Sequence, residues 1–296
     1  MTAVRKEYQR KVDATLKSTL TFMAISSLFV CLIGFVYCCA TGFALIAQAD
    51  GFIIGLSALF AFILTVNTCL CIFGAKYGSL AMITAFATLG TLVISTIYGL
   101  IADPLKNHLN AFNLLGLSLA IVIMGLSFIT EKNKETSLEE TEKKNSKIFI
   151  FICLAVFLFN GSALSVYSIF TTNRASYNGF NFIFLYLFFC VMICGIALGI
   201  LLGLDKKNKQ KFCIKECISG KALICSLLYG IVFFGAEFCA LTTTSLLPIV
   251  IQAPLSFAVN VIIVAIVDYL VYKQKLSKIQ LLQIGLAIVC GVLFAL

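Results

Sequence analysis

The sequence predicts an all-α, polytopic membrane protein with about nine transmembrane helices. Of its 296 residues 61% are hydrophobic and only 12% are charged, whereas soluble chains are roughly half apolar and a quarter charged. Apolar runs of about 20 residues, enough to cross a hydrocarbon core of about 30 Å as a helix, recur along almost the whole chain. No alternating strand pattern competes with them. An ordinary soluble enzyme is therefore excluded.

Charged residues separate the apolar runs and delimit the expected spans to within a few residues. The polar stretch 131–147 alternates acids and bases without apolar periodicity, so it reads as a cytoplasmic linker. It divides the chain into a first membrane repeat of about four helices, 1–130, and a second of five helices, 148–296. The expected spans are 17–40, 52–74, 79–101, 111–130, 148–170, 180–204, 222–243, 248–271 and 279–296.

Lys and Arg are distributed very unevenly between alternate loops. Only Lys106 and Arg174 fall on one side, and the other 20 of the 22 fall on the opposite side. Because the basic side of a membrane protein is usually cytoplasmic, we expect the N-terminus on the cytoplasmic side of the cell membrane. The net charge of +9 is then mainly a topology signal. Nucleic acid is not an expected partner, since short Lys clusters are not a basic folded surface with stacking aromatics.

Most of the 13 Cys lie within expected spans, where Cys behaves as a small apolar residue. Cys213 and Cys217 share a loop at i, i+4 spacing, but the only His, His108, lies in a loop on the other side. We therefore expect no metal site and no cofactor.

A weak internal repeat links the two halves. When Ser79 is aligned with Ser245, several apolar residues after them match in order. After a gap of one residue, the run 119–122 is repeated at 286–289. The alignment pairs 17–40 with 180–204, 52–74 with 222–243, 79–101 with 248–271 and 111–130 with 279–296. Transporters are often built from such duplicated halves with the binding site between them.

The segment Ala240–Leu296, with its weaker echo in Ala75–Gly125, resembles the drug/metabolite transporter (DMT) superfamily, in particular its EamA-like ten-helix members. The resembling features are a tight turn between helices after an "AL" motif and an apolar "GxxL" run in the last helix. The resemblance implies two pseudo-symmetric halves of five helices in an inverted-repeat bundle. The chain departs from that pattern because Lys273-Gln274-Lys275 replaces an acidic residue. The first of the family's ten helices also has no counterpart here, since VRKEYQRK near the N-terminus resembles the loop that follows that helix. Two alternatives are open: the chain starts at an internal Met, or the protein has nine spans.

Glu237 is the only charged residue well within an expected span. Its charged form is costly in hydrocarbon, and the spans hold no Lys or Arg in their interiors to balance it, so we expect it to be neutral or to bind a proton or cation. Helical spacing places Gly230 and Ala240 on its face, where small residues favour close packing. The alternatives are a protonated Glu that hydrogen-bonds a neighbour, and a carboxylate that reaches the outer interface.

The next span carries a polar stripe of Gln252, Ser256 and Asn260 at i, i+4 and i+8. Pro254 lies in the same helix and removes an amide donor, so we expect a kink there. Such helices often line substrate sites, although the stripe is also compatible with interhelical hydrogen bonds alone.

Further polar residues are secondary candidates for a substrate or proton site. Asn160 and Tyr167 share a face of 148–170, and Asn67 and Thr68 lie in 52–74. Thr84, Thr88, Thr91 and Ser95 form a stripe in 79–101, but hydroxyls of this kind often bond back to their own helix.

Gly195, Gly199 and Gly203 form a GxxxGxxxG stripe that favours packing within the bundle over dimerisation. Oligomeric state therefore stays open between monomer and homodimer. No GxGxxG, P-loop, HExxH or GxSxG pattern occurs, and a single intramembrane Glu makes no catalytic constellation, so we expect no enzymatic activity.

The leading hypothesis is a secondary transporter for a small metabolite or drug-like molecule, working by alternating access, with its cavity among 79–101, 148–170, 222–243 and 248–271. A cationic or neutral substrate is expected, because an anion would require a Lys or Arg. Proton coupling through Glu237 is part of this hypothesis. The alternatives are a non-transporting scaffold or receptor, and a channel, which would need rings of charge or a filter segment.

Overall fold

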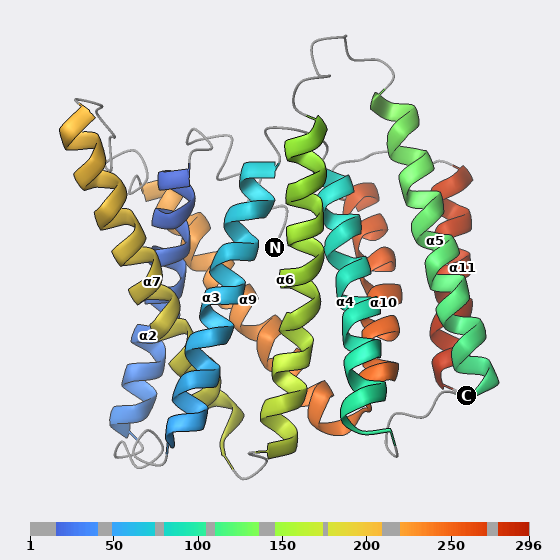
Figure 1. Cartoon of the computed structure of the whole chain (residues 1–296), viewed down its shortest axis with the longest axis horizontal. Helices are drawn as coiled ribbons and strands as arrows, with labels where there is room; N and C mark the ends of the chain where they lie inside the picture. The colour runs from blue at the N-terminus through green and yellow to red at the C-terminus, as the bar shows by residue number, and fades with distance from the viewer. Residues whose placement is uncertain are drawn as a thin grey trace. The chain divides into compact units, whose positions relative to one another are not determined.

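The computed structural model describes residues 16–40, 49–74, 80–104, 110–135, 146–173, 177–208, 220–270 and 278–295. In these ranges all regular structure is helical, and each expected span lies on a helix. The helices are α2 (Leu16–Ala40), α3 (Gly51–Gly74), α4 (Leu80–Ala102), α5 (Ala111–Glu135), α6 (Ser146–Asn173), α7 (Gly179–Asn208), α9 (Gly220–Leu246), α10 (Ile249–Leu270) and α11 (Lys278–Ala295) (Figure 1).

Within the described ranges, five helical segments are long and apolar enough to cross a membrane. They are 21 to 26 residues long, which matches the thickness of a bilayer core. This is the organisation of a multi-pass integral membrane protein. The segments are Leu16–Val36, Gly51–Cys71, Ile148–Asn173, Gly179–Leu204 and Ala222–Leu246.

Polar residues just before three helices fix where those helices begin. Oδ1 of Asp50 accepts from the amide of Ile53 at 2.9 Å, before α3. Asn110 and Asn178 cap α5 and α7 in the same way, with Oδ1 accepting at 2.7 and 2.9 Å. Each cap satisfies an amide that has no partner within its helix.

The chain forms two compact units, each discontinuous in sequence. Unit 1 comprises 1–73 and 169–245, and therefore holds α2, α3, α7 and α9. Unit 2 comprises 74–168 and 246–296, and holds α4, α5, most of α6, α10 and α11. Each unit thus combines helices from before and after the linker 131–147. The halves 1–130 and 148–296 describe chain order and repetition rather than contacts, and they stay a prediction.

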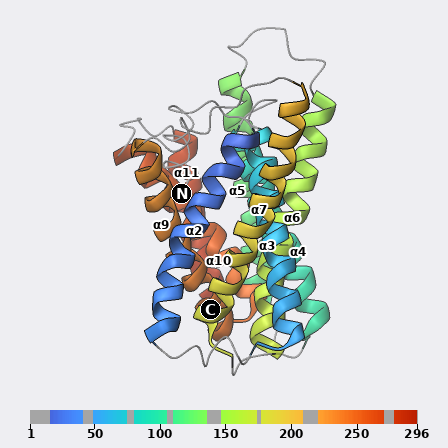
Figure 2. The same ribbon diagram turned by 90° about the vertical axis from the view of Figure 1, so that its left-hand side faces the viewer.

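Helices that the repeat pairs with each other lie in the same unit. In unit 1, α2 packs along α7 (Figures 1 and 2). In unit 2, α4 packs against α10, and α5 packs against α11. This is the contact pattern expected when equivalent helices of two repeats lie side by side.

Unit 1 is held together by a cluster of buried residues on α2, α7 and α9. The rings of Phe22 and Tyr229 lie 4.9 Å apart at its centre. A second aromatic group joins α3 to α7, where Phe60 packs edge-on against Tyr186 at 4.7 Å. Large buried rings of this kind supply much of the packing energy between helices in lipid.

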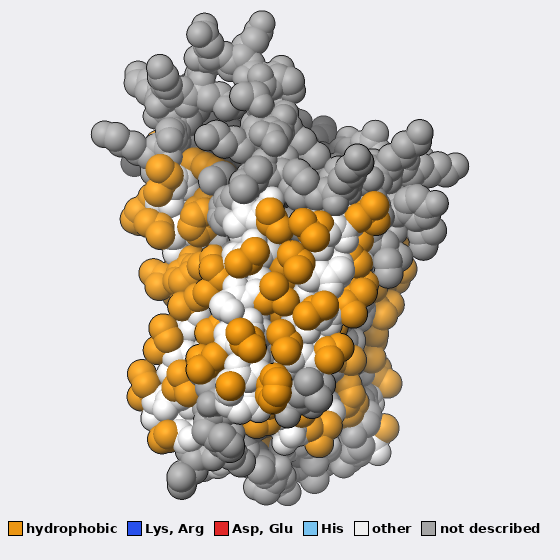
Figure 3. All heavy atoms as spheres, turned by 90° about the vertical axis from the view of Figure 1, so that its right-hand side faces the viewer, with side chains coloured by type: hydrophobic (Ala, Val, Ile, Leu, Met, Phe, Trp, Pro, Cys, Tyr) orange, Lys and Arg blue, Asp and Glu red, His pale blue; other side chains and the backbone are white. Residues whose placement is uncertain are grey.

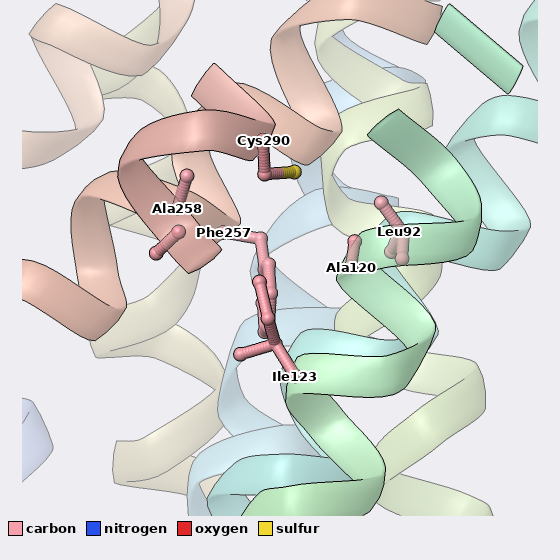
Figure 4. Close-up of a cluster of buried hydrophobic side chains, with 7 residues drawn as sticks. Leu92, Ala120, Ile123, Phe257, Ala258 and Cys290 are labelled. Carbon is pink, nitrogen blue, oxygen red and sulfur yellow. The ribbon is translucent and has the colours of Figure 1, made fainter. Parts of the chain in front are cut away.

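Unit 2 has a separate core between α4, α5, α10 and α11. Phe257 of α10 points toward Ile123 of α5 (Figure 4), and Leu92 of α4 belongs to the same cluster. The thiol of Cys290 on α11 donates to the carbonyl oxygen of Gly116 on α5 at 3.3 Å. This bond reinforces the contact between α5 and α11.

The outer surface of α5 and α11 is apolar. Figure 3 shows hydrophobic side chains over this face, and no charged side chain among its described residues. Leu114, Leu115 and Leu281 are each more than half exposed. In water such a surface would be costly, but lipid solvates it.

The glycine stripe of α7 does not pack as expected. A Cβ built on Gly195, Gly199 or Gly203 meets no atom within 4 Å in the described part of the chain, and all three are exposed. The predicted packing of this stripe inside the bundle is therefore wrong for these residues, because α7 turns another face toward α2.

Candidate functional site

Glu237 lies in α9 of unit 1 and is half-buried. Its helical face includes Gly230, two turns earlier, and Leu241, one turn later. A Cβ on Gly230 would lie 2.6 Å from the backbone oxygen of Ser26 on α2, so only glycine fits there. Leu241 packs against Gly179 of α7. The face that carries Glu237 is therefore turned toward α2 and α7, as the small residue at Gly230 predicted.

Cys190 of α7 is buried in unit 1. Its thiol donates to the carbonyl oxygen of Ala61 on α3 at 3.7 Å. Cys190 thus links α7 to α3 within unit 1.

A small cavity lies along the same face of α9. Its volume is about 10 Å³, close to the minimum that holds one water molecule. Its lining is almost wholly apolar, although three of the residues that border it carry hydroxyls, namely Ser26 and Ser27 of α2 and Tyr229 of α9. The remaining lining residues are Met23, Val30, Leu187, Gly230 and Phe233.

The sequence did not identify this cavity. Ser26 and Ser27 stand in an apolar span where hydroxyls are common, and a cavity depends on how three helices meet. The sequence features that could have pointed to the cavity are the pair Ser26-Ser27 and Gly230, which lies two turns before Glu237. Each feature alone is ordinary in a membrane helix.

The predicted stripe on α10 belongs to unit 2. Gln252 is only 1% exposed, whereas Ser256 one turn later is exposed. The side chain of Asn260 lies outside the described residues, as does that of Thr84. The stripe therefore leaves the interior within one turn of Gln252.

Pro254 is buried, and α10 remains a continuous helix from Ile249 to Leu270 around it. It lies in the second turn, where the loss of one amide donor affects the carbonyl of Val250 near the helix start. Because Pro254 lies beyond the first turn, its missing amide removes one internal hydrogen bond of α10.

Asn160 of α6 joins α6 to α4 within unit 2. Its amide nitrogen donates to the carbonyl oxygen of Ala87 and to Oγ1 of Thr91, both at 2.8 Å. Ser95 of α4 donates to the carbonyl oxygen of Gly161 at 3.3 Å. These bonds are the interhelical kind that holds membrane helices together.

Two glycines allow this close approach of α4 and α6. A Cβ on Gly90 would collide with the backbone oxygen of Phe157, and one on Gly161 would lie 2.5 Å from the backbone oxygen of Gly90. Because of these two glycines, the backbones of α4 and α6 touch directly, and the hydrogen bonds of Asn160 and Ser95 join the two helices at the same place.

The other predicted residues are divided between the units. Tyr167 of α6 is 3% exposed and lies in unit 2 with Asn160, Gln252 and Ser256. Asn67 and Thr68 of α3 lie in unit 1 with Glu237. Glu237 shares α9 with the cavity residues Tyr229, Gly230 and Phe233, and the α10 stripe belongs to the other unit.

Metal ligands do not gather in the part of the chain that the structure describes: no group of three His, Cys, Asp or Glu side chains occurs there. The Cys residues described in these ranges are free thiols. Cys213, Cys217 and His108 lie outside the described residues.

No protein-family model and no curated protein matches the sequence. A solved crystal structure of a protein is similar over 97% of this chain and 90% of its own, with a TM-score of 0.59 at 15% identity. That likeness shows a shared fold over nearly the full length of both chains. Resemblance to the drug/metabolite transporter superfamily stays a prediction.

Proposed function

We propose that the chain is a secondary transporter of the cell membrane that moves a small cationic or neutral molecule by alternating access, with Glu237 as its proton-carrying group. One observation carries this proposal. The only carboxylate well inside an expected span, Glu237, lies half-buried on the face of α9 that packs toward α2 and α7. Intramembrane carboxylates in such positions usually serve a function, because burying them is costly.

The packing of repeat-paired helices supports the transporter class. Pairs α2–α7, α4–α10 and α5–α11 each contact within one unit, as expected for two repeats with equivalent helices side by side. The same features agree with the predicted nine spans and with membership of the drug/metabolite transporter superfamily, both of which remain part of the proposal.

A thermal-shift ligand screen tests the proposal. Purified protein and Glu237→Gln are screened with organic cations, amino acids, sugars and nucleosides at two pH values. A ligand that binds only the folded state raises the unfolding temperature. We expect one compound class to stabilise the parent protein in a pH-dependent way and to lose that effect in Glu237→Gln. No stabilisation of either protein would refute the proposal.

A non-transporting scaffold is the second candidate, and the contact between α4 and α6 favours it. There Asn160 and Ser95 bond to the neighbouring helix, so the polar residues act as interhelical links. This alternative predicts that Glu237→Gln changes thermal stability only.

A further inference from the structure

We infer that a second copy of this chain packs on α10, with the glycine stripe of its α7 against the exposed face around Ser256. The inference goes beyond the proposed transport and does not depend on it. Two features of the structure carry it. One is an equivalence between α4 and α10 that fails on a single face, and the other is a glycine stripe left open on α7.

The packing of unit 2 agrees with the register of the internal repeat, residue by residue. This register pairs Leu92 of α4 with Ala258 of α10, and Ala120 of α5 with Ala287 of α11. All four side chains are buried in one hydrophobic cluster (Figure 4). The remaining equivalent pair in that cluster is Ile123 and Cys290. Equivalent residues of the two repeats therefore occupy equivalent places in the core of unit 2.

The exposed surfaces of the paired helices agree as well. Leu114 of α5 and its counterpart Leu281 of α11 are 54% and 55% exposed. Ile97 of α4 and its counterpart Ile263 of α10 are 52% and 51% exposed. Helices α4 and α10 thus turn corresponding residues toward the core and toward the outside.

One face departs from this equivalence. Gly90 of α4 is buried against the backbone of Phe157 on α6, whereas its counterpart on α10, Ser256, is exposed. Val259, on the same face of α10, is exposed, and its counterpart Val93 is only partly exposed. In the described ranges, α10 therefore lacks the neighbour that α6 provides for α4.

The residues of this face are those of a contact between membrane helices. Ser256 is small and carries a hydroxyl, and by helical spacing Asn260 falls on the same face one turn later. In membranes, small residues let two backbones approach, and hydroxyl and amide side chains bond across the contact. Lipid offers Ser256 no such partner, so a helix is the better occupant of this face.

The contact of α6 on α4 defines what the occupant of the α10 face should be. Helices α4 and α6 are the third and fifth expected spans, so they cross the membrane in the same direction. The occupant should likewise run parallel to α10. Because Ser256 stands where α4 has Gly90, the occupant must supply the small residues itself. In α6 the residue at the contact, Gly161, lies about four turns after the helix start.

Helix α7 of a second copy meets each of these conditions. It is the sixth expected span and α10 is the eighth, so the two cross in the same direction. Gly195 lies about four turns after the start of α7, as Gly161 does in α6. A Cβ on Gly195, Gly199 or Gly203 meets no atom within 4 Å in the described part of the chain. Since no helix of the same chain covers the stripe there, the contact joins two copies.

Self-association in lipid tests the inference without any substrate. Donor-labelled and acceptor-labelled full-length protein are reconstituted together into liposomes, and energy transfer is measured as the protein is diluted with lipid. Gly195→Leu and Ser256→Leu each obstruct one side of the contact. Gly125→Leu and Ser118→Leu are the matched controls, because they place the same side chain at exposed positions of α5.

We expect the apparent dissociation constant to rise about tenfold or more in Gly195→Leu and in Ser256→Leu, because leucine holds the two backbones apart. Both controls should associate like the parent protein. Donor-labelled Gly195→Leu mixed with acceptor-labelled Ser256→Leu should recover association, since this pair retains one intact α10 and one intact α7.

Three results would overturn the inference. They are a parent protein without energy transfer above random proximity, parent-like association of both contact variants, and a mixed pair that stays apart after each variant has failed alone. The last result would indicate contacts between like helices instead. Circular dichroism and thermal unfolding check that each variant folds, and Gly199→Leu replaces Gly195→Leu if that variant does not. None of these results bears on the role of Glu237, which the ligand screen tests separately.

Discussion

At the scale of single residues, polar groups in the interior of this protein have two kinds of surroundings. Asn160 is enclosed by hydrogen bonds to α4. Glu237 lies instead half-buried on the face of α9 that packs toward α2 and α7, one turn after Phe233, which borders a small cavity. The first arrangement stabilises a contact between helices, and the second leaves a group able to change its protonation.

A double-mutant cycle between Asn160 and Thr91 measures the first arrangement. We expect a coupling energy of about 0.6–1.7 kcal/mol between Asn160→Leu and Thr91→Val, the range found for interhelical hydrogen bonds in membranes. Reversible unfolding of the purified protein in mixed detergent measures it. Additive effects of the two changes would mean that the bond contributes nothing to stability.

The glycine opposite Ser26 gives a second prediction at this scale. Gly230→Ala places a methyl group 2.6 Å from a backbone oxygen, so we expect a loss of about 1–3 kcal/mol. Gly235→Ala on the same helix is the matched control, because a Cβ there meets nothing within 4 Å. It should be neutral or should stabilise the helix by up to about 1 kcal/mol. Equal unfolding free energies for the two variants would contradict the packing of α2 on α9.

Prediction from sequence worked unevenly for residues. Glu237 was identifiable because a charge within a span is rare and costly. Ser27 and Tyr229 were not, because hydroxyls occur throughout such spans and only the meeting of α2, α7 and α9 makes a cavity beside them. Helical spacing predicted the polar stripe of α10, but spacing does not say which face of a helix is buried. Ser256 of that stripe is exposed.

At the scale of elements, hydropathy located the helices well. Apolar runs predict where a chain can lie in lipid, so each expected span lies on a helix. Hydropathy predicts the ends of the helices less well, because a helix can continue beyond the membrane into water. Helix α5 extends to Glu135 and α7 to Asn208, both beyond the expected ends at 130 and 204. Capping by Asp50, Asn110 and Asn178 fixes three of the starts.

The contact between α4 and α6 depends on glycine at two positions. We expect Gly90→Ala to cost about 1–3 kcal/mol, because its methyl group would collide with the backbone of Phe157. Gly125→Ala in α5 is the control, since a Cβ there meets no atom within 4 Å. Thermal unfolding of the two purified variants compares them. A lower unfolding temperature for Gly125→Ala than for Gly90→Ala would show that α4 and α6 do not pack this closely.

At the scale of the whole molecule, the chain forms two compact units that are discontinuous in sequence, while the two repeats 1–130 and 148–296 stay a prediction. Each unit takes helices from before and after the linker 131–147. Sequence comparison between halves could pair α2 with α7 and α5 with α11, but it could not show that paired helices touch. Contacts between distant segments depend on which faces complement each other, and apolar composition alone does not specify those faces.

Proton movement driven by substrate tests the central claim most directly. A compound that stabilises the parent protein in the ligand screen is added to proteoliposomes loaded with a pH-sensitive dye. We predict saturable uptake or efflux of the compound accompanied by a change in internal pH, with the pH change absent in Glu237→Gln. Equal flux and equal pH change in the parent protein and in Glu237→Gln would contradict the assignment of Glu237 as the proton-carrying group.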